Sequence, residues 1–160
     1  MIRAMRNTDW DAVAEIYQAG MDTNLATFQT ECPSWEEWDS THSAKCRLVA
    51  EKDGSVIGWA ALSPTSSREA YAGVAEVSIY IDDTEQNAGV GTELLQALCR
   101  EAEKEGFWTL QSSIFSENQA SIRLHVKCGF RLIGRREKIG KDRLGVWRDT
   151  VLMELRNNID

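Results

Sequence analysis

The sequence predicts an α/β fold in which one central mixed β-sheet carries helices on both of its faces. Segments with the two-residue alternation of strands are interleaved with segments that have the 3.6-residue period of helices. No repeat, linker or break in composition divides the 160 residues, and this length is typical of one domain. Hydrophobic residues make up 42% of the chain and charged residues 27%, which is the balance of a folded globular protein. We therefore expect a single domain over residues 1–160.

The first third of the chain is predicted to hold one short strand and two helices. Met1–Arg6 is the strand, and Trp10–Met21 has apolar residues spaced along one helix face. Thr8 is placed to cap that helix. A second helix is expected to begin at Ser34, because Ser34 and Glu37 form a capping box.

A β-hairpin and a third strand are expected next. The segments Arg47–Lys52 and Ser55–Leu62 have strand patterns and flank Asp53-Gly54, which favours the positive φ angles of a type I′ turn. Val74–Ile81 alternates along its length, with Val77, Ile79 and Ile81 on one face and Glu76, Ser78 and Tyr80 on the other.

The second half continues the alternation of helices and strands. A helix follows a glycine-bearing loop and is expected to end at Gly106. The remaining predicted elements are a strand at Thr109–Ile114, a short helix at Asn118–Lys127, and strands at Phe130–Gly134 and Val151–Leu155. The predicted order is β-α-α-β-β-β-α-β-α-β-β.

Composition excludes several classes of function. The 18 lysines and arginines against 25 aspartates and glutamates give a net charge of −7, which argues against a nucleic-acid surface. No apolar run has the length of a membrane span, and the N-terminus lacks the apolar core of a signal peptide. The four cysteines show no zinc-ligand spacing and there are only two histidines, so we expect no metal and a cytoplasmic protein with reduced thiols.

The most informative segment lies between the strand Val74–Ile81 and the following helix. It consists of Gln86, Asn87, Ala88, Gly89, Val90, Gly91 and Thr92. Two glycines let the backbone approach a ligand closely, and free amides at a helix N-terminus bind anions. The alternative is a turn that only starts a helix. The spacing matches neither a Walker loop nor a Gly-x-Gly-x-x-Gly dinucleotide loop.

The motif Gln86-x-x-Gly89-x-Gly91 resembles the acetyl-CoA pyrophosphate loop of the GNAT superfamily of N-acetyltransferases. The later segment from Asn118 to Phe130, with its Gly-Phe end, resembles a second motif of that superfamily. The similarity extends from Ile2 to Leu155 and is greatest to the phosphinothricin and methionine sulfoximine acetyltransferases.

The resemblance implies a GNAT-like fold, acetyl-CoA as cosubstrate, and acetyl transfer to the amine of a small amino-acid-like molecule by direct attack in a ternary complex. It also implies a homodimer. By the same resemblance, the backbone at Ile79 and Ile81 binds the pantetheine arm. The side chain of Asn118 contacts that arm or the acetyl carbonyl, although a plain helix N-cap would fit this residue equally well.

Two residues are candidates for acid–base catalysis. Glu76 matches the general base of the similar enzymes, which would accept the amine proton through water; the alternative is a strand glutamate in a salt bridge. His125 takes the position where the wider superfamily has a tyrosine that protonates the departing sulfur. An ordinary histidine pKa near 6.5 would leave it partly protonated at pH 7. The alternative is a histidine that packs beside Phe130.

Three residues are candidates for acceptor binding by resemblance: Phe28, Thr30 and Arg68. An arginine is a natural bidentate partner for an amino-acid carboxylate, but Arg68 lies in a serine-rich loop and could simply be solvated. Two other functions remain open from the sequence. One is acetylation of a protein N-terminus or a polyamine, and the other is a non-catalytic module that senses acetyl-CoA.

Overall fold

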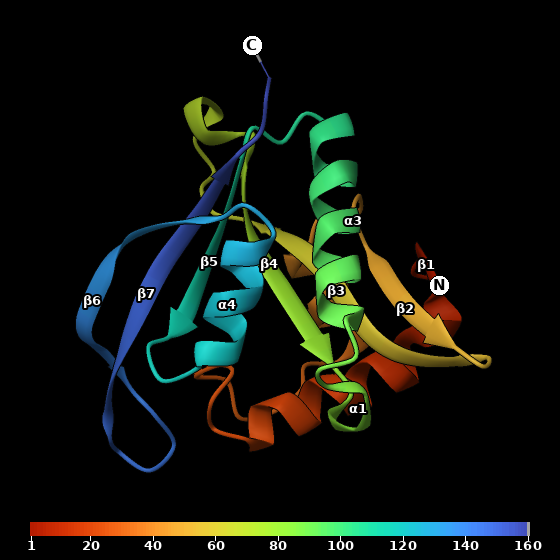
Figure 1. Ribbon diagram of the computed structural model, residues 1–160, viewed down its shortest axis with the longest axis horizontal. Helices are drawn as coiled ribbons and strands as arrows, with labels where there is room; N and C mark the ends of the chain where they lie inside the picture. The colour runs from red at the N-terminus through yellow and green to blue at the C-terminus, as the bar shows by residue number, and fades with distance from the viewer. Residues whose placement is uncertain (160) are drawn as a thin grey trace.

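The computed structural model describes residues 1–159 and contains a seven-stranded mixed sheet (Figure 1). The strand order is β1-β2-β3-β4-β5-β7-β6, and each neighbouring pair is antiparallel except β4 and β5. The strands are β1 (Ile2–Ala4), β2 (Leu48–Lys52), β3 (Ser55–Pro64), β4 (Val74–Ile81), β5 (Thr109–Phe115), β6 (Arg131–Lys141) and β7 (Trp147–Arg156). The predicted fold class, a mixed sheet with helices on both faces, is confirmed.

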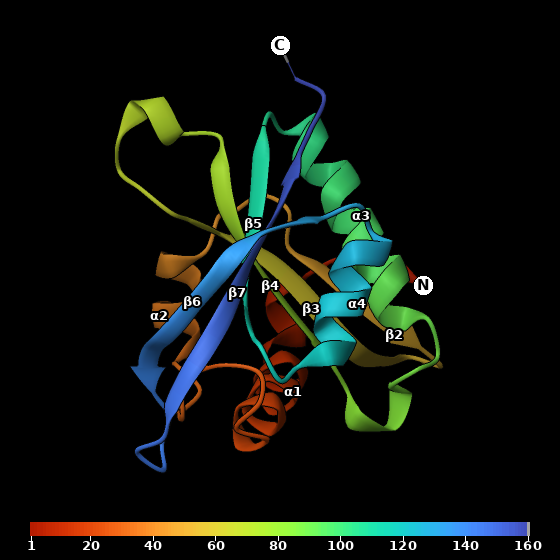
Figure 2. The ribbon, with the colours of Figure 1, turned by 60° about the vertical axis from the view of Figure 1, so that its left-hand side comes forward.

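Helices cover the two faces of the sheet in pairs. They are α1 (Trp10–Asp22), α2 (Trp35–Thr41), α3 (Val90–Lys104) and α4 (Gln119–Lys127), with short 3-10 turns at η1 (Asn7–Asp9), η2 (Glu69–Tyr71) and η3 (Asp83–Glu85). α3 and α4 pack on one face, and α1 and α2 pack on the other (Figures 1 and 2). Within residues 1–159, no helix is long and apolar enough to cross a bilayer.

The structure confirms two of the predicted helix ends and corrects a third. Ser34 accepts the backbone N–H of Glu37 in a capping box, and Gly106 has φ +89° where α3 stops. The expected cap by Thr8 is wrong, because Thr8 lies inside the 3-10 turn η1. Asp9 caps this turn instead: its carboxylate accepts the N–H of Arg6 at 2.7 Å and pairs with Arg3 at 2.8 Å.

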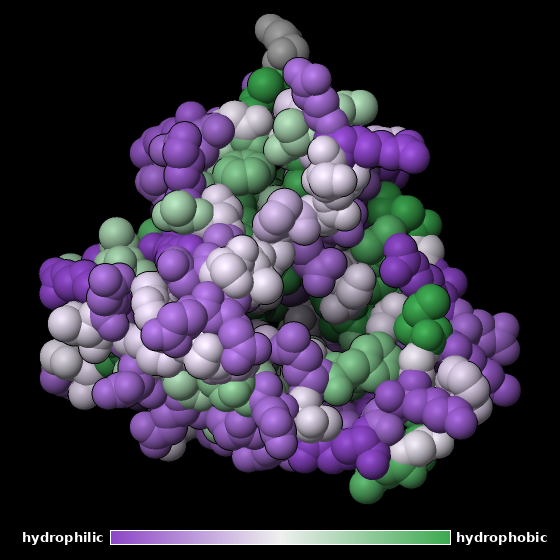
Figure 3. All heavy atoms as spheres, turned by 180° about the vertical axis from the view of Figure 1, so that it is seen from behind, coloured by the Kyte–Doolittle hydropathy of each residue, from purple (hydrophilic) through white to green (hydrophobic). Residues whose placement is uncertain are grey.

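β6 and β7 are longer than predicted. β6 is the edge strand of the sheet, so most of its side chains are exposed and no apolar alternation marks its second half. Because charged residues replace the apolar alternation there, the hydrophobic period did not predict this part of the strand. Apolar side chains that remain exposed gather along this side of the molecule, at the right of Figure 3. They are Leu132, Ile133, Ile139, Leu144, Val146 and Trp147.

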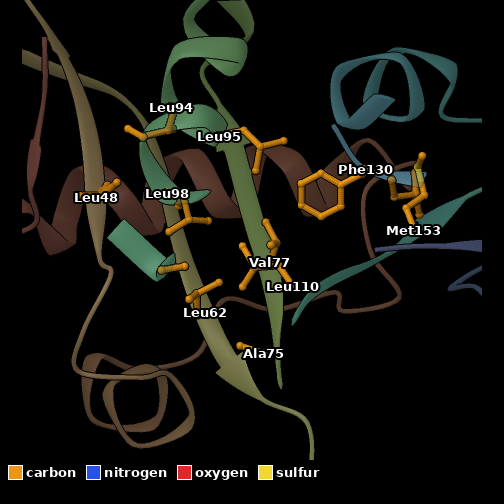
Figure 4. Packing of buried hydrophobic residues seen from close by; sticks show 14 of the residues in the cluster. Leu48, Leu62, Ala75, Val77, Leu94, Leu95, Leu98, Leu110, Phe130 and Met153 are labelled. Carbon is orange, nitrogen blue, oxygen red and sulfur yellow. The ribbon is translucent and has the colours of Figure 1, made fainter. Parts of the chain in front are cut away.

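The main core lies between α3 and the sheet. Figure 4 shows Leu94, Leu95 and Leu98 of α3 pointing toward the strands. All three side chains are fully buried, as are the strand residues Leu62 and Leu110 beneath them. Burial of one such side chain contributes about 1.5–3 kcal/mol, so this layer fixes α3 and its N-terminus over the middle of the sheet.

β4 and β5 pair only at their beginnings. In the described chain, residues 74–76 pair with residues 109–111, and the pairing stops there although β4 continues to Ile81 and β5 to Phe115. The outer neighbours keep both strands straight, because β3 pairs along β4 to Ile81 and β7 pairs along β5 to Phe115. The two strands therefore diverge and leave unpaired backbone groups between them.

A buried arginine ties the β6–β7 hairpin to the loop after α1. Arg148 donates to the carbonyl of Asn24 at 2.9 Å, to Asp142 at 3.1 Å and to Glu117 at 3.1 Å. Its guanidinium also lies 4.1 Å from the centre of the Phe115 ring. Asn24 closes the network with a hydrogen bond to Asp142. This network holds the loop against the hairpin.

We expect Arg148→Met to loosen that loop. Loss of the guanidinium leaves Asp142 and the Asn24 carbonyl without their shared donor, and removing one partner of a buried pair is strongly destabilising. The melting temperature should fall, and limited proteolysis should cut faster within residues 23–31. Arg131→Met is the matched control, because the Arg131–Glu154 pair is exposed and such pairs contribute about 0–1 kcal/mol. Equal melting temperatures and cleavage rates in the two variants would contradict the assigned role.

Candidate active site

Two clefts open where β4 and β5 diverge. One has a volume of about 460 Å³ and is lined by the loop before α3 and by α4; we call it the glycine-loop cleft. The other, of about 440 Å³, is lined by β4, β5 and the loop after α1; we call it the Glu76 cleft. Both are lined by Ala26, Ile79, Tyr80, Asn118 and Ser121. The clefts therefore meet at the divergence of the strands.

The glycine-loop cleft contains the positive end of α3. Gly89 is the N-cap residue with φ +83°, a left-handed conformation that favours glycine. The first helical bond is from Glu93 to Gly89, so the amides of the first turn have no partner within the helix. A Cβ built on Gly91 would lie 3.3 Å from Leu124 on α4, so the absence of a side chain lets the two helices approach.

Most of the residues predicted for cofactor binding line this cleft. They are Ile79, Ile81, Gln86, Asn87, Gly89, Gly91, Thr92 and Asn118. Ala88 and Val90 belong to the same loop but are not among the lining residues. Gln86 donates its side-chain N–H to the Ile81 carbonyl at 3.1 Å, which ties the loop to the end of β4.

Sequence reasoning missed two cations in the glycine-loop cleft. Arg123 and Lys127 lie one turn apart on α4 and line the cleft opposite the α3 N-terminus. α3 and α4 lie side by side in Figures 1 and 2. Like charges four residues apart destabilise a helix slightly, and an anion between the cation and the amides would relieve that repulsion. The spacing of Arg123 and Lys127, one helix after the glycine loop, was the available signal.

Asn118 uses both ends of its side-chain amide within the protein. Its Oδ1 accepts the backbone N–H of Ser121 at 3.2 Å, so the side chain caps α4. Its Nδ2 donates to the Leu25 carbonyl at 3.3 Å. Asn118 thus fixes the start of α4 against the loop after α1, at the point where the two clefts meet.

Glu76 provides the carboxylate of the Glu76 cleft. It lies on the same face of β4 as Ser78 and Tyr80, as the alternation predicted. Burial raises the pKa of Glu76, while a hydrogen bond with Gln111 and the positive charge of Arg136 act to lower it. A partly buried carboxylate with a raised pKa in a cleft is suited to accepting a proton.

His125 also lines the Glu76 cleft, but it is 2% exposed and both ring nitrogens are engaged. Nδ1 lies 2.7 Å from the Ser121 carbonyl, which can only accept, so Nδ1 carries the proton. Nε2 then accepts the Ser112 hydroxyl at 2.9 Å. Burial lowers the pKa of His125, outweighing the Ser121 bond. A lowered pKa disfavours the protonated imidazole that the sequence analysis expected at pH 7.

Aromatic rings form the walls of the Glu76 cleft. Phe28 packs edge-on against Phe115 with ring centroids 4.7 Å apart. The ring centroids of Tyr17 and Tyr80 lie 4.8 Å apart. Phe28 thus lines this cleft. Thr30 lies just outside this lining, exposed, with its carbonyl accepting a hydrogen bond from Gln18.

Arg68 lies in a different place from the other predicted site residues. It lines an open cleft of about 700 Å³ at the start of β4, together with Tyr71, Trp108 and Arg156. The η2 segment that follows it projects at the upper left of Figure 2. Within one chain, the structure does not bring Arg68 to Glu76. Within residues 1–159, no three or more histidine, cysteine or acidic side chains are grouped so that they could hold a metal ion.

The chain that forms these two clefts is similar to a known family of proteins. A family model described as the acetyltransferase (GNAT) family matches residues 10–130. The chain belongs to this family. The GNAT-like fold and the acetyltransferase activity expected from the sequence are both confirmed.

Named relatives of this GNAT acetyltransferase act on small amino-acid-like amines. It is 33% identical over 163 residues to the phosphinothricin N-acetyltransferase of Alcaligenes faecalis, covering 96% of this chain and 80% of the relative. It is 31% identical over 127 residues to the L-methionine sulfoximine/L-methionine sulfone acetyltransferase of Pseudomonas aeruginosa, covering 79% and 72%. A crystal structure of a phosphinothricin acetyltransferase from Sinorhizobium meliloti in complex with acetyl-CoA superposes with a TM-score of 0.88 at 30% identity, covering 98% and 87%.

The buried imidazole of this acetyltransferase makes its stability depend on pH. Because the pKa of His125 is lower in the folded protein than the ordinary value near 6.5, the unfolded chain binds the proton more readily. The free energy of unfolding should therefore fall as pH drops through about 6.5, by up to ~1.4 kcal/mol per pH unit for one such group. His125→Gln should flatten that slope in urea titrations between pH 7.5 and 5.5.

His42→Gln provides the companion measurement. The pKa of His42 is also lowered by burial, so this variant removes a second, independent part of the slope. An unchanged slope in His125→Gln would show that His125 does not titrate on unfolding.

Proposed function

We propose that the protein transfers an acetyl group from acetyl-CoA to the amine of a small amino-acid-like acceptor, of the phosphinothricin or methionine sulfoximine type. The reaction is direct attack within a ternary complex. The observation that carries this proposal is the meeting of the two clefts at Ile79, Tyr80, Asn118 and Ser121. Two substrates held in these clefts would touch at the divergence of β4 and β5.

The glycine-loop cleft fits acetyl-CoA. The first-turn amides of α3 and the positive helix end suit a pyrophosphate, and Arg123 and Lys127 add two positive charges. The unpaired backbone between β4 and β5 suits the amide groups of a pantetheine arm. When bound, acetyl-CoA supplies the acetyl group as a thioester with a thiolate leaving group.

Glu76 acts on the acceptor. An amino-acid amine is largely protonated at neutral pH and must lose a proton before it can attack a carbonyl carbon. The Glu76 carboxylate lies in the cleft with Ser78 on one side of it and can take that proton directly or through a water. Because its pKa is raised by burial, Glu76 is a stronger base than an exposed glutamate.

His125 holds other groups in place in this mechanism. Its neutral ring joins Ser121 of α4 to Ser112 of β5, which fixes the start of α4 beside the cleft. A thiol has an ordinary pKa of about 8.5, so a thiolate departs without an obligatory acid. His125 is therefore a positioning residue and Glu76 the proton acceptor.

The structure also argues for direct attack over an acetyl-cysteine route. Cys128 lies at the end of α4, where its thiol contacts the Thr92 carbonyl at 3.8 Å. Burial raises the pKa of this thiol, which disfavours the reactive thiolate. Cys128 lines neither cleft.

The proposal is tested by measuring free thiol release from acetyl-CoA with a panel of amines. Phosphinothricin, L-methionine sulfoximine and L-methionine sulfone should be acetylated far more efficiently than spermidine or a short peptide with a free N-terminus. Initial-rate plots should intersect, as expected for a ternary complex. Parallel plots, or preference for the peptide or polyamine, would overturn this assignment, and no thiol release with any amine would favour an acetyl-CoA sensor.

We expect Glu76→Gln to lower turnover at neutral pH by about 10²–10⁴-fold, because the amide keeps the shape of the side chain and cannot accept a proton. The loss should shrink as the pH approaches the pKa of the acceptor amine, where the free amine is abundant. Turnover is measured between pH 6 and 10. Glu103→Gln, on the exposed side of α3, is the control. Near-normal turnover of Glu76→Gln at pH 7 would leave Glu76 with a structural role.

We expect Gly91→Val to weaken acetyl-CoA binding by about tenfold or more while the Michaelis constant for the acceptor changes little. A side chain at this position would press on Leu124 and move the α3 amides. Calorimetric titration with acetyl-CoA measures the effect. Gly134→Val is the matched control, because a Cβ there has open space and its φ needs no glycine. Equal affinity in both variants would exclude the loop as the pyrophosphate site.

A further inference from the structure

We propose that Arg136 determines acceptor specificity by binding a carboxylate that neighbours the reacting amine. The inference rests on the proposed function and deepens it, because it assigns one residue to the selection of amino-acid acceptors over simple amines. Arg136 lies on β6, outside the segments that the sequence analysis singled out. Three observations support the inference: the sheet register, the charges of the Glu76 cleft, and the ion pairs that the other cations already form.

The register places Arg136 on the face of the sheet that carries the Glu76 cleft. Arg136 is directly opposite Thr150 of β7, and Thr150 is directly opposite Phe115 of β5. Thr150 and Phe115 both line the cleft. Directly opposed side chains share a face and stand about 5 Å apart, so Arg136 is one strand beyond the lining. An extended arginine side chain spans that interval.

The Glu76 cleft has an unbalanced set of charges for an amino-acid acceptor. Among residues 1–159, Glu76 is the one acidic residue that lines this cleft, and it would attract the ammonium group. His42 and His125 also line it, but burial lowers the pKa of both and so disfavours their cationic forms. No lysine or arginine within residues 1–159 lines the cleft itself. An acceptor carboxylate would therefore be desolvated without a partner unless a cation reaches in from the rim.

Arg136 is an arginine beside the cleft that is free to do so. On the same face, Arg148 is held by Asp142 and Glu117, and Arg131 by Glu154. Arg135 faces the other side of β6 and pairs with Asp149 at 2.6 Å. The side chain of Arg136 has no ion pair or hydrogen bond to any residue between 1 and 159, and it is exposed. Its fork of N–H donors matches a carboxylate in a bidentate pair.

Arg136 is also coupled to Glu76. Burial raises the pKa of Glu76, and the charge of Arg136 is one of the two influences that oppose this rise. This influence of Arg136 on Glu76 suits an acceptor with an amine and a carboxylate on one carbon. It also predicts that removal of Arg136 raises the pKa of Glu76 further.

The test compares L-methionine sulfone with its primary carboxamide as acceptors, at saturating acetyl-CoA. Arg136→Gln should lower kcat/KM for the free acid by about 10–100-fold and for the carboxamide by less than about threefold, because only the acid offers a charged partner. Arg136→Lys should recover part of the loss, since it restores charge without the fork. The acid limb of the kcat/KM profile for the carboxamide should move to higher pH in Arg136→Gln.

Arg135→Gln is the matched control, with the same change of charge on the same strand but on the opposite face. It should alter neither the ratio of the two acceptors nor the acid limb. Equal losses for the acid and the carboxamide in Arg136→Gln, or no loss for either, would overturn the assignment while leaving the acetyltransferase activity in place. Absence of wild-type activity with both acceptors would instead overturn the proposed acceptor class, and this inference with it.

Discussion

The divergence of β4 from β5 is the constraint on which the functional architecture depends. After three residue pairs the strands part, yet each stays paired with its outer neighbour to its last residue, and this pairing holds the two strands apart. Backbone donors and acceptors inside a protein need partners, and here a ligand with amide groups can supply them. The core beneath α3 holds one side of the gap, and the Arg148 network holds the loop that covers the other.

The two clefts carry different local charges, and the positive charge of the glycine-loop cleft is opposite to the net charge of the chain. With a net charge of −7, the protein as a whole repels anions, and its sites must overcome this locally. Arg123 and Lys127 line the glycine-loop cleft, where the uncompensated amides of α3 already favour negative groups. In the neighbouring cleft, Glu76 gives a negative interior. Tyr80 and Asn118 line both clefts and lie between the positive region of the glycine-loop cleft and the negative region around Glu76.

Sequence predicted the parts of the protein whose signals are local. The Ser34 capping box, the Asp53-Gly54 turn and the end of α3 at Gly106 each depend on a few neighbouring residues, and the structure has all three. The long edge strand β6 was hidden because exposed side chains carry no alternation. The buried state of His125 and the remote place of Arg68 depend on contacts between segments far apart in the chain, and no local pattern encodes them.

The two clefts differ in how they are assembled from the chain. The glycine-loop cleft is built mainly from one continuous stretch, residues 79–127, whereas the Glu76 cleft gathers its walls from the loop after α1, from β4 and β5, and from β7. Substitutions in the scattered walls can therefore alter the shape of the Glu76 cleft while the glycine-loop cleft keeps its geometry. This separation offers a starting point for redesigning the Glu76 cleft without disturbing the glycine-loop cleft.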